Sequence, residues 1–157
     1  MKQLITEIEI EAPAETVWEI LTGLDAYPEW NPFIVSAAGQ VEVGATLRNR
    51  LEPPGGKAMT FKPTVTVVEP NTKFEWLGRL GFGGIFDGRH IFELEPTAAG
   101  TRFVQREEFT GILVPLFARS LDNGTRTGFE AMNRAMKQRA EAAAPKEADG
   151  TQGRNHT

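Results

Sequence analysis

The chain has 157 residues and a formal net charge of -4, a size that suits one domain with one hydrophobic core. Hydrophobic residues make up 40% and charged residues 24% of the sequence, so its composition is that of an ordinary globular protein with no basic excess for nucleic acid. The absence of cysteine excludes disulfides, thiolate metal sites and cysteine nucleophiles. The two histidines, His90 and His156, are too few for a histidine metal cluster, and we expect neither metal nor cofactor.

The N-terminal segment MKQLITEIEIEAP alternates polar and apolar residues and lacks the continuous apolar run of a signal peptide. No segment approaches the length needed to span a bilayer. We therefore expect a cytoplasmic protein without an integral membrane segment.

The first part of the chain predicts a strand followed by two short helices. Residues 3 to 11 place Leu4, Ile8 and Ile10 on one face and glutamates on the other, which is typical of a half-buried strand. After Pro13, apolar residues recur at helical spacing until Gly23. The aromatic and proline-rich segment 24 to 33 predicts a second helical turn that leads into a strand at residues 33 to 37.

The middle of the chain predicts a β-meander. Strands are expected near residues 45 to 52, 59 to 69, 72 to 80, 85 to 95 and 101 to 111, because glycine and proline clusters separate these segments. Several of the gaps are short enough for hairpins.

A long amphipathic helix is predicted over residues 116 to 144, with Gly124 and Gly128 on the stripe that includes Leu121 and Met132. The two glycines are expected either to kink this helix or to let another element pack close. Residues 145 to 157 contain no large apolar side chain, so a disordered tail is predicted after a single domain of residues 1 to 144.

This order of elements indicates an α+β fold with the helix on one face of an antiparallel sheet. A twisted sheet must curl around a single long helix, and the curl leaves a gap beneath it. Because protein interiors are close-packed, the gap predicts an internal apolar pocket for a small molecule.

Five segments together resemble the START-like superfamily, also called SRPBCC, which includes the polyketide cyclase/dehydrase and lipid-transport groups. They are residues 12 to 18, 27 to 33, 74 to 76, 88 to 92 and 107 to 111. The resemblance runs from about residue 2 to residue 142. It implies a helix-grip fold, in which about seven antiparallel strands curve around a long C-terminal helix, and a cavity for hydrophobic ligands such as lipids, sterols, quinones or polyketides. It implies no single chemistry, because members range from carriers to enzymes.

The hairpin of the strands at 85 to 95 and 101 to 111 contains the polar residues of most interest. A turn at residues 96 to 100 permits pairing of His90 with Glu107 and of Phe92 with Gln105. Both strand faces are rich in aromatic residues and should point inward, where an unpaired polar group costs several kcal/mol. The pair is then either a structural histidine satisfied by a carboxylate, an anchor for a ligand oxygen, or an acid and base in catalysis.

Other residues of the expected pocket are aromatic or aliphatic, and each has an alternative role in the core. Trp76 is core or pocket wall, and Trp30 either covers a cavity mouth or stabilises its loop. The candidate ligand-binding residues are Trp30, Phe33, Trp76, Phe86, His90, Phe92, Gln105, Glu107, Phe109, Phe117 and Leu121.

The sequence is compatible with three functions. The first is binding or carriage of a small hydrophobic molecule, such as a lipid, quinone, polyketide or aromatic compound, by a protein that is not an enzyme. The second is a cyclase or dehydratase that uses His90 and Glu107, which an inward-facing Arg89 would favour. The third is a protein-interaction module, which a filled interior beside an exposed apolar patch would favour. No nucleic-acid partner is expected, and a homodimer is left open.

Overall fold

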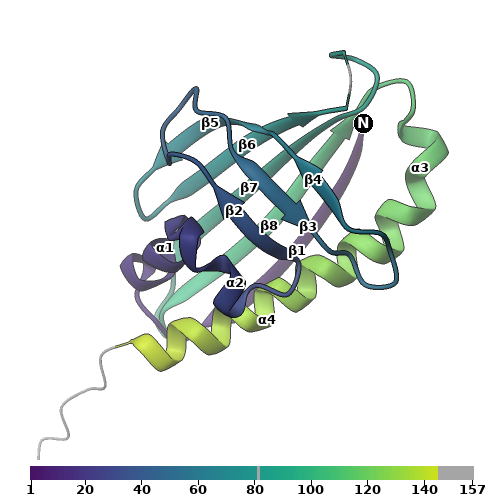
Figure 1. Cartoon of the computed structure of the whole chain (residues 1–157). Coiled ribbons are helices and arrows are strands. Elements are labelled where there is room, and N and C mark those ends of the chain that lie inside the picture. Colours follow the sequence, from purple (N-terminus) through teal and green to yellow (C-terminus); the bar gives the residue numbers. More distant parts are fainter. Residues whose placement is uncertain (81, 145–157) are drawn as a thin grey trace, which may run out of the picture.

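The computed structural model describes residues 1–80 and 82–144, so the predicted tail lies outside the described residues. The chain begins with strand β1 (Lys2–Ile10), followed by the short helices α1 (Ala14–Thr22), η1 (Leu24–Ala26) and α2 (Tyr27–Trp30). Seven strands follow: β2 (Ile34–Ala38), β3 (Arg48–Leu51), β4 (Met59–Phe61), β5 (Thr64–Glu69), β6 (Lys73–Arg79), β7 (Asp87–Pro96) and β8 (Thr101–Thr110). Helix α3 (Val114–Ser120), the π-turn η2 (Leu121–Thr125) and helix α4 (Arg126–Ala143) complete the fold (Figure 1).

The strands form two antiparallel sheets. One has the order β1-β8-β7-β6-β5 and the other has the order β2-β3-β4. The expected strand at 59 to 69 is split into β4 and β5 by Lys62 and Pro63, since proline cannot donate a hydrogen bond to a ladder. An isolated bridge between Thr46 and Thr64, with backbone hydrogen bonds beside it, joins the segment before β3 to β5. The predicted α+β helix-grip fold is confirmed.

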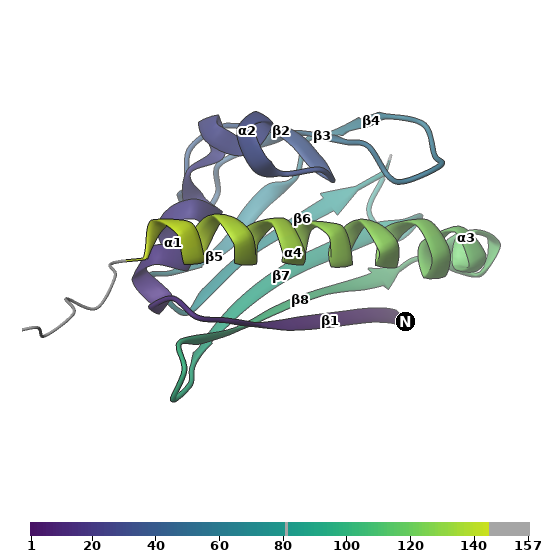
Figure 2. The same cartoon turned by 90° about the horizontal axis from the view of Figure 1, so that it is seen from below.

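Helix α4 lies between the two sheets, with β2, β3 and β4 on one side of it and β1 and β8 on the other (Figure 2). Its buried stripe contains Phe129, Met132, Asn133, Met136 and Ala140, at the helical spacing that the sequence predicts. The curved five-stranded sheet thus presents its inner face to α4.

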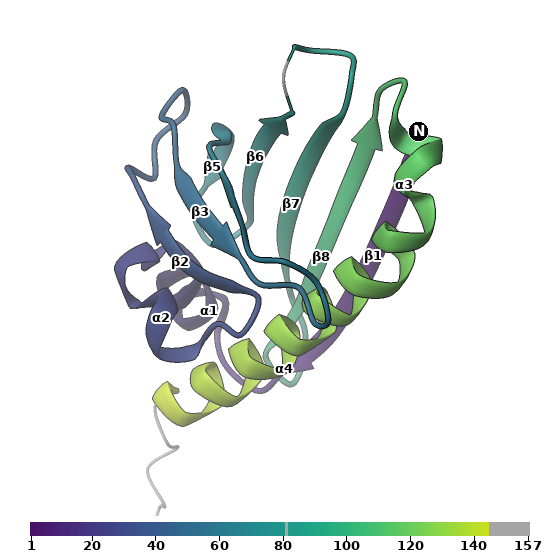
Figure 3. The ribbon, with the colours of Figure 1, turned by 45° about the vertical axis from the view of Figure 1, so that its right-hand side comes forward.

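The predicted long helix is interrupted, because the π-turn η2 separates α3 from α4 and α3 lies beside the N-terminal end of β1 (Figure 3). Gly124 lies in this π-turn, and a Cβ there would meet no atom within 4 Å. A Cβ on Gly128 would lie 2.4 Å from the Phe33 ring. Of the two expected roles of these glycines, Gly128 therefore serves close packing, whereas Gly124 lies where the helix changes course.

Residues 27 to 33 connect the short helices to the core. The Tyr27 hydroxyl donates a hydrogen bond to the Leu21 carbonyl at 2.5 Å, and burial raises the pKa of this phenol. The Asn31 carboxamide oxygen accepts hydrogen bonds from the backbone N–H groups of Phe33 and Ile34. These contacts direct the chain from α2 into β2 and place Phe33 against α4.

Candidate functional site

The register of β7 and β8 confirms the predicted pairing on the inner face. His90 is opposite Glu107, and Phe92 is opposite Gln105. Leu94 pairs with Phe103 and Gly88 pairs with Phe109. Strand β1 extends this face, because Leu4 pairs with Glu107 and Thr6 pairs with Gln105.

His90 lies among aromatic rings and is only 3% exposed. The centroid of its ring is 4.4 Å from that of Phe92 and 5.0 Å from those of Trp76 and Phe129. Burial lowers the pKa of His90 to about 3, and its hydrogen bond with Gln105 opposes this shift only in part. The imidazole is therefore neutral at physiological pH.

Glu107 lies beside His90 and has few partners. Its Oε2 is 3.7 Å from His90 Nδ1, beyond hydrogen-bond range, and its side chain is 17% exposed. Burial raises the pKa of Glu107 to about 8. Near neutral pH this group is mainly a carboxylic acid with unused hydrogen-bonding capacity.

Glycine at position 88 makes room for this carboxyl group. A Cβ on Gly88 would lie 2.7 Å from Glu107 Oε1 and 3.8 Å from Phe109 Cδ1. The Glu107 carboxyl and the Phe109 ring therefore lie next to each other over Gly88.

A buried polar network extends from His90 into the core. His90 Nε2 is 2.9 Å from Gln105 Oε1, and Gln105 Nε2 donates to Asn133 Oδ1 at 2.8 Å. Asn133 Nδ2 donates to Thr6 Oγ1 at 2.9 Å, and the Thr6 hydroxyl donates to the Gln105 carbonyl at 3.2 Å. The candidates from the sequence omit Thr6 and Asn133. The sequence does contain a pattern that could have identified them. Thr6 is a polar residue between the apolar Leu4 and Ile8 on one face of β1, and Asn133 is a polar residue on the otherwise apolar buried stripe of α4.

The other candidate residues separate into core and rim. Phe33, Trp76, Phe92, Phe109 and Leu121 are buried in the hydrophobic core. Phe86 is partly buried, and Phe117 is 39% exposed. The centroid of the Phe86 ring is 5.8 Å from that of Phe109 and 5.7 Å from that of Phe117, so these three rings form an aromatic group at the α3 end of the inner face.

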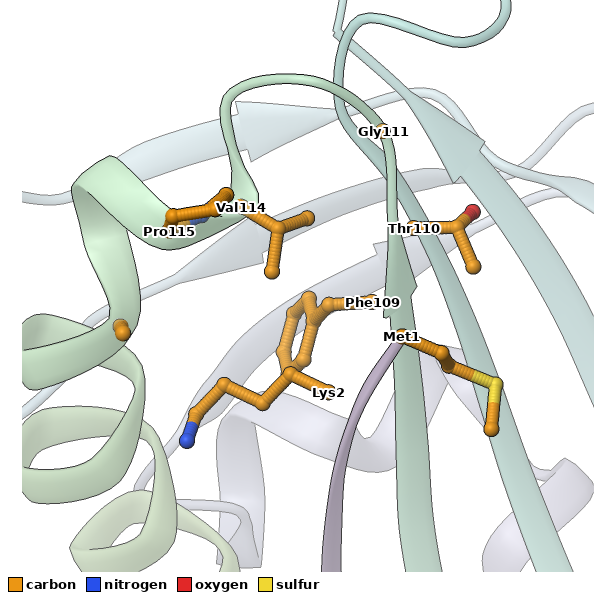
Figure 4. Close-up of a pocket in the computed structure, with 8 residues that line it drawn as sticks. Met1, Lys2, Phe109, Thr110, Gly111, Val114 and Pro115 are labelled. Carbon is orange, nitrogen blue, oxygen red and sulfur yellow. The ribbon is translucent and has the colours of Figure 1, made fainter.

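Two open hollows in the described part of the chain are lined by candidate residues. The first, of about 380 Å³, lies between α3 and the ends of β1 and β8; it is lined by Met1, Lys2, Phe109, Thr110, Gly111, Val114, Pro115 and Ala118. Figure 4 shows the Phe109 ring between Val114 and Lys2, whereas the Met1 and Thr110 side chains point away from α3. Phe109 thus lines this hollow, and Glu107 lies two positions before it on the same face of β8.

The second hollow, of about 620 Å³, lies between α2 and the last turns of α4. Trp30 lines it, together with an ion pair in which Arg139 lies 2.8 Å from Glu29. Of the candidate residues, Trp30 lines this hollow and Phe109 lines the first. The rings of Trp76, Phe92 and Phe129 pack around His90.

The donor set for a metal ion is poor. Residues 1–80 and 82–144 contain no group of three or more histidine, aspartate or glutamate side chains that could hold a metal. Among the same residues, no helix is long and apolar enough to cross a membrane.

Comparison with known proteins identifies the family. The family model for polyketide cyclase/dehydrase and lipid transport matches residues 1–143. The chain belongs to this family. Comparison with curated protein sequences gives no significant match.

Solved structures of low sequence identity share the fold of this polyketide cyclase/dehydrase family member. Protein MLL2253 from Mesorhizobium loti is 20% identical with a TM-score of 0.72, over 92% of this chain and 100% of that one. The protein TTHA0849 from Thermus thermophilus is 17% identical with a TM-score of 0.73, over 92% of this chain and 100% of that one. The di-domain ARO/CYC StfQ of the steffimycin biosynthetic pathway is 15% identical with a TM-score of 0.72, over 89% of this chain and 50% of that one.

Proposed function

We propose that this protein binds a small hydrophobic molecule on the inner face of its sheet, at the end covered by α3. Membership of a family that includes lipid transport supports this proposal. The observation that carries it is the position of the Glu107 carboxyl, which lies beside the Phe109 and His90 rings and has no hydrogen bond among the described residues. Burial raises the pKa of this carboxyl to about 8. A polar group left without partners in this way destabilises a fold, and such groups concentrate at functional sites.

The hollow beside α3 is the proposed entrance. Phe109 lines this hollow and lies two positions after Glu107 on the same face of β8. The Phe86 ring lies 5.8 Å from the Phe109 ring, and the partly exposed Phe117 ring lies 5.7 Å from the Phe86 ring. Rotation of the Phe109 ring would join the hollow to the inner face. An aromatic or aliphatic ligand that replaces this ring would bury its apolar surface against the same neighbours, at about 25 cal/mol per Å².

Native mass spectrometry of the freshly purified protein, followed by extraction, tests for a bound molecule. A panel of fatty, phenolic and polycyclic compounds should raise the melting temperature through linkage. Ala118→Trp would fill the hollow beside α3 and should abolish these shifts. Ala142→Trp, the matched control in the second hollow, should leave them intact. The proposal fails if no molecule is retained and no compound stabilises the protein.

Catalysis by His90 and Glu107 is a second candidate that uses the same residues. Their 3.7 Å separation and opposite pKa shifts would suit His90 as base and Glu107 as acid. Arg89 lies on the outer face in an ion pair with Glu75, so the inward-facing arginine that would favour an enzyme is not present. Glu107→Gln should abolish turnover but preserve binding if the pair is catalytic.

Exposed apolar side chains support the third candidate, an interaction module. Phe82, Ile112 and Leu116 are 83%, 79% and 74% exposed. The backbone N–H of Ile112 donates to the Gly84 carbonyl, so the loops before β7 and after β8 are in contact. The double substitution Phe82→Ser and Ile112→Ser should abolish any self-association measured by analytical ultracentrifugation but should leave small-molecule binding unchanged.

A further inference from the structure

Four buried polar side chains from four elements form a continuous hydrogen-bonded chain through the core. They are His90 on β7, Gln105 on β8, Asn133 on α4 and Thr6 on β1, and their exposures are 3%, 0%, 2% and 7%. Burial of so many polar groups is tolerated because each has a partner. This series of hydrogen bonds ends at the backbone carbonyl of Gln105, which accepts from Thr6.

The carbonyl at the end of this chain determines the direction of every hydrogen bond. A carbonyl has no proton, so the Thr6 hydroxyl must donate to it, and the Thr6 oxygen is then free to accept from the Asn133 amide nitrogen. The Asn133 carboxamide oxygen consequently faces the amide nitrogen of Gln105. Rotation of either carboxamide would bring two donors or two acceptors together.

The last link concerns His90. The Gln105 carboxamide oxygen faces His90 Nε2 at 2.9 Å, and because this oxygen can only accept, Nε2 must carry the proton. A neutral imidazole with its proton on Nε2 has a lone pair on Nδ1. That nitrogen faces Glu107 Oε2 at 3.7 Å.

We propose that Gln105, Asn133 and Thr6 are positioning residues that hold the His90 proton on Nε2, so that Nδ1 and the Glu107 carboxyl together recognise a hydroxyl group of the ligand. This inference rests on the proposed function for its ligand half, whereas the proton on His90 Nε2 follows from the hydrogen bonds and the neutral ring follows from burial of the imidazole.

A hydroxyl group fits this pair by geometry and by proton count. Two atoms 3.7 Å apart are too far for a direct hydrogen bond, but an oxygen about 2.8 Å from both can bridge them. The ligand hydroxyl would donate to Nδ1 and accept from the Glu107 carboxylic acid. A ketone or an ether has no proton for Nδ1, so the pair selects phenols, enols and alcohols on an apolar scaffold.

Nitrogen NMR of the imidazole tests the first half of the inference. The protein with His156→Ala retains His90 as its sole histidine, so ¹⁵N-histidine labelling reports on that ring alone. A two-bond ¹H–¹⁵N correlation spectrum at neutral pH should show Nε2 protonated and Nδ1 unprotonated. A protonated Nδ1, a mixture of tautomers or a charged ring would overturn the inference.

Two substitutions at Thr6 separate a directing role from simple packing. Thr6→Val keeps the shape and removes the hydroxyl that orients the chain, so a population with the proton on Nδ1 should appear. Thr6→Ser keeps the hydroxyl and should retain the wild-type spectrum. If the valine variant is folded and has an unchanged tautomer, Thr6 does not position His90; if it does not fold, the wild-type spectrum still decides the state of His90.

Binding of 1-naphthol and of its methyl ether tests the second half. Wild-type protein should bind the naphthol about tenfold more tightly than the ether, and His90→Phe should remove this preference because it removes Nδ1, the acceptor for the ligand proton. Equal binding of both compounds overturns hydroxyl recognition while leaving the proposed function intact. If neither compound binds but other hydrophobic molecules do, hydroxyl recognition at this pair is likewise overturned; if nothing binds, the proposed function falls with it.

Discussion

Arg89 and His90 are neighbours on β7, but their side chains leave the sheet on opposite faces and lie beside carboxyl groups of opposite behaviour. On the outer face, Arg89 forms an ion pair with Glu75. On the inner face, His90 lies beside Glu107. Burial acts to raise the pKa of both glutamates, yet the pKa of Glu75 is lowered and that of Glu107 is raised.

The number of partners explains this difference. Glu75 is 4% exposed, but it accepts hydrogen bonds from Arg89 and Thr66 and lies 3.5 Å from Lys73 Nζ. These contacts outweigh the burial of the carboxylate and keep it charged. Among the described residues no ion pair or hydrogen bond joins the Glu107 carboxyl to a cation, and the neutral His90 lies beside it, so burial dominates its pKa. The outer pair is therefore a completed structural interaction, whereas the inner pair has hydrogen-bonding capacity to spare for a ligand.

Removing one hydrogen-bond partner on each face of the sheet should give the largest contrast in stability. Gln105→Leu leaves His90 Nε2 and the Asn133 oxygen without partners in the core, which should lower the free energy of unfolding by about 2–5 kcal/mol. Arg89→Leu leaves Glu75 with Thr66 and Lys73 and should cost about 1 kcal/mol. Urea unfolding of both variants measures this difference, and a greater loss for the arginine variant would reverse the comparison.

The two faces should also differ in their response to pH. The pKa of Glu107 rises from 4.5 to about 8 on folding. Between these two pH values Glu107 is protonated in the folded protein but ionised in the unfolded chain, so stability falls as the pH rises. The pKa of His90 falls from 6.5 to about 3 on folding. Between these two pH values His90 is protonated in the unfolded chain but neutral in the folded protein, so stability rises with pH. The two slopes cancel between pH 4.5 and 6.5.

The uncompensated fall from pH 6.5 to 8 should amount to about 2 kcal/mol. Glu107→Gln should remove this fall, because the amide does not ionise. The outer pair affects stability at acidic pH. Because folding lowers the pKa of Glu75 from 4.5, the stabilisation from its carboxylate is present above that pH and is lost as the pH falls through the folded-state pKa. Urea unfolding across this range measures both limbs, and a wild-type stability that stays constant from pH 6.5 to 8 would show that Glu107 is ionised throughout.

A pair of glycine substitutions should give the smallest effect on stability. A Cβ on Gly88 would meet Glu107 Oε1 at 2.7 Å, whereas a Cβ on its partner Gly78 has no neighbour closer than 3.8 Å. Gly88→Ala should displace the flexible carboxyl, at a cost of about 1 kcal/mol, and should reduce the alkaline loss of stability. Gly78→Ala should stay within about 0.5 kcal/mol of wild type. Equal pH profiles for the two variants would show that Gly88 does not shape the position of Glu107.

Much of the inner face could be predicted from the sequence because it depends on local rules. Side chains alternate along a strand, and the turn between β7 and β8 sets the register that brings His90 opposite Glu107. The spacing of apolar residues likewise predicted the buried stripe of α4, of which Met132 and Met136 are part.

Other features of the site could not be predicted in this way. Thr6 and Asn133 are 127 positions apart in the sequence and meet only because α4 packs against β1. Pro63 interrupts the strand predicted at residues 59 to 69. Gly124 indicated either a kink in the last helix or a close contact, and only the structure decided for the interruption at η2. The expected gap beneath α4 is occupied by side chains around His90, since aromatic rings from β6, β7 and α4 converge there.

The sequence by itself determined the order of the elements and the facing of His90 and Glu107, because these follow from periodicity and turn length along one stretch of chain. Only the tertiary structure decided their chemical state. A pKa depends on the partners that reach a group from other elements, and here Gln105 orients the imidazole while no side chain completes the hydrogen bonding of Glu107 among the described residues. Partners of this kind are a property of packing between distant segments, which local sequence patterns do not encode.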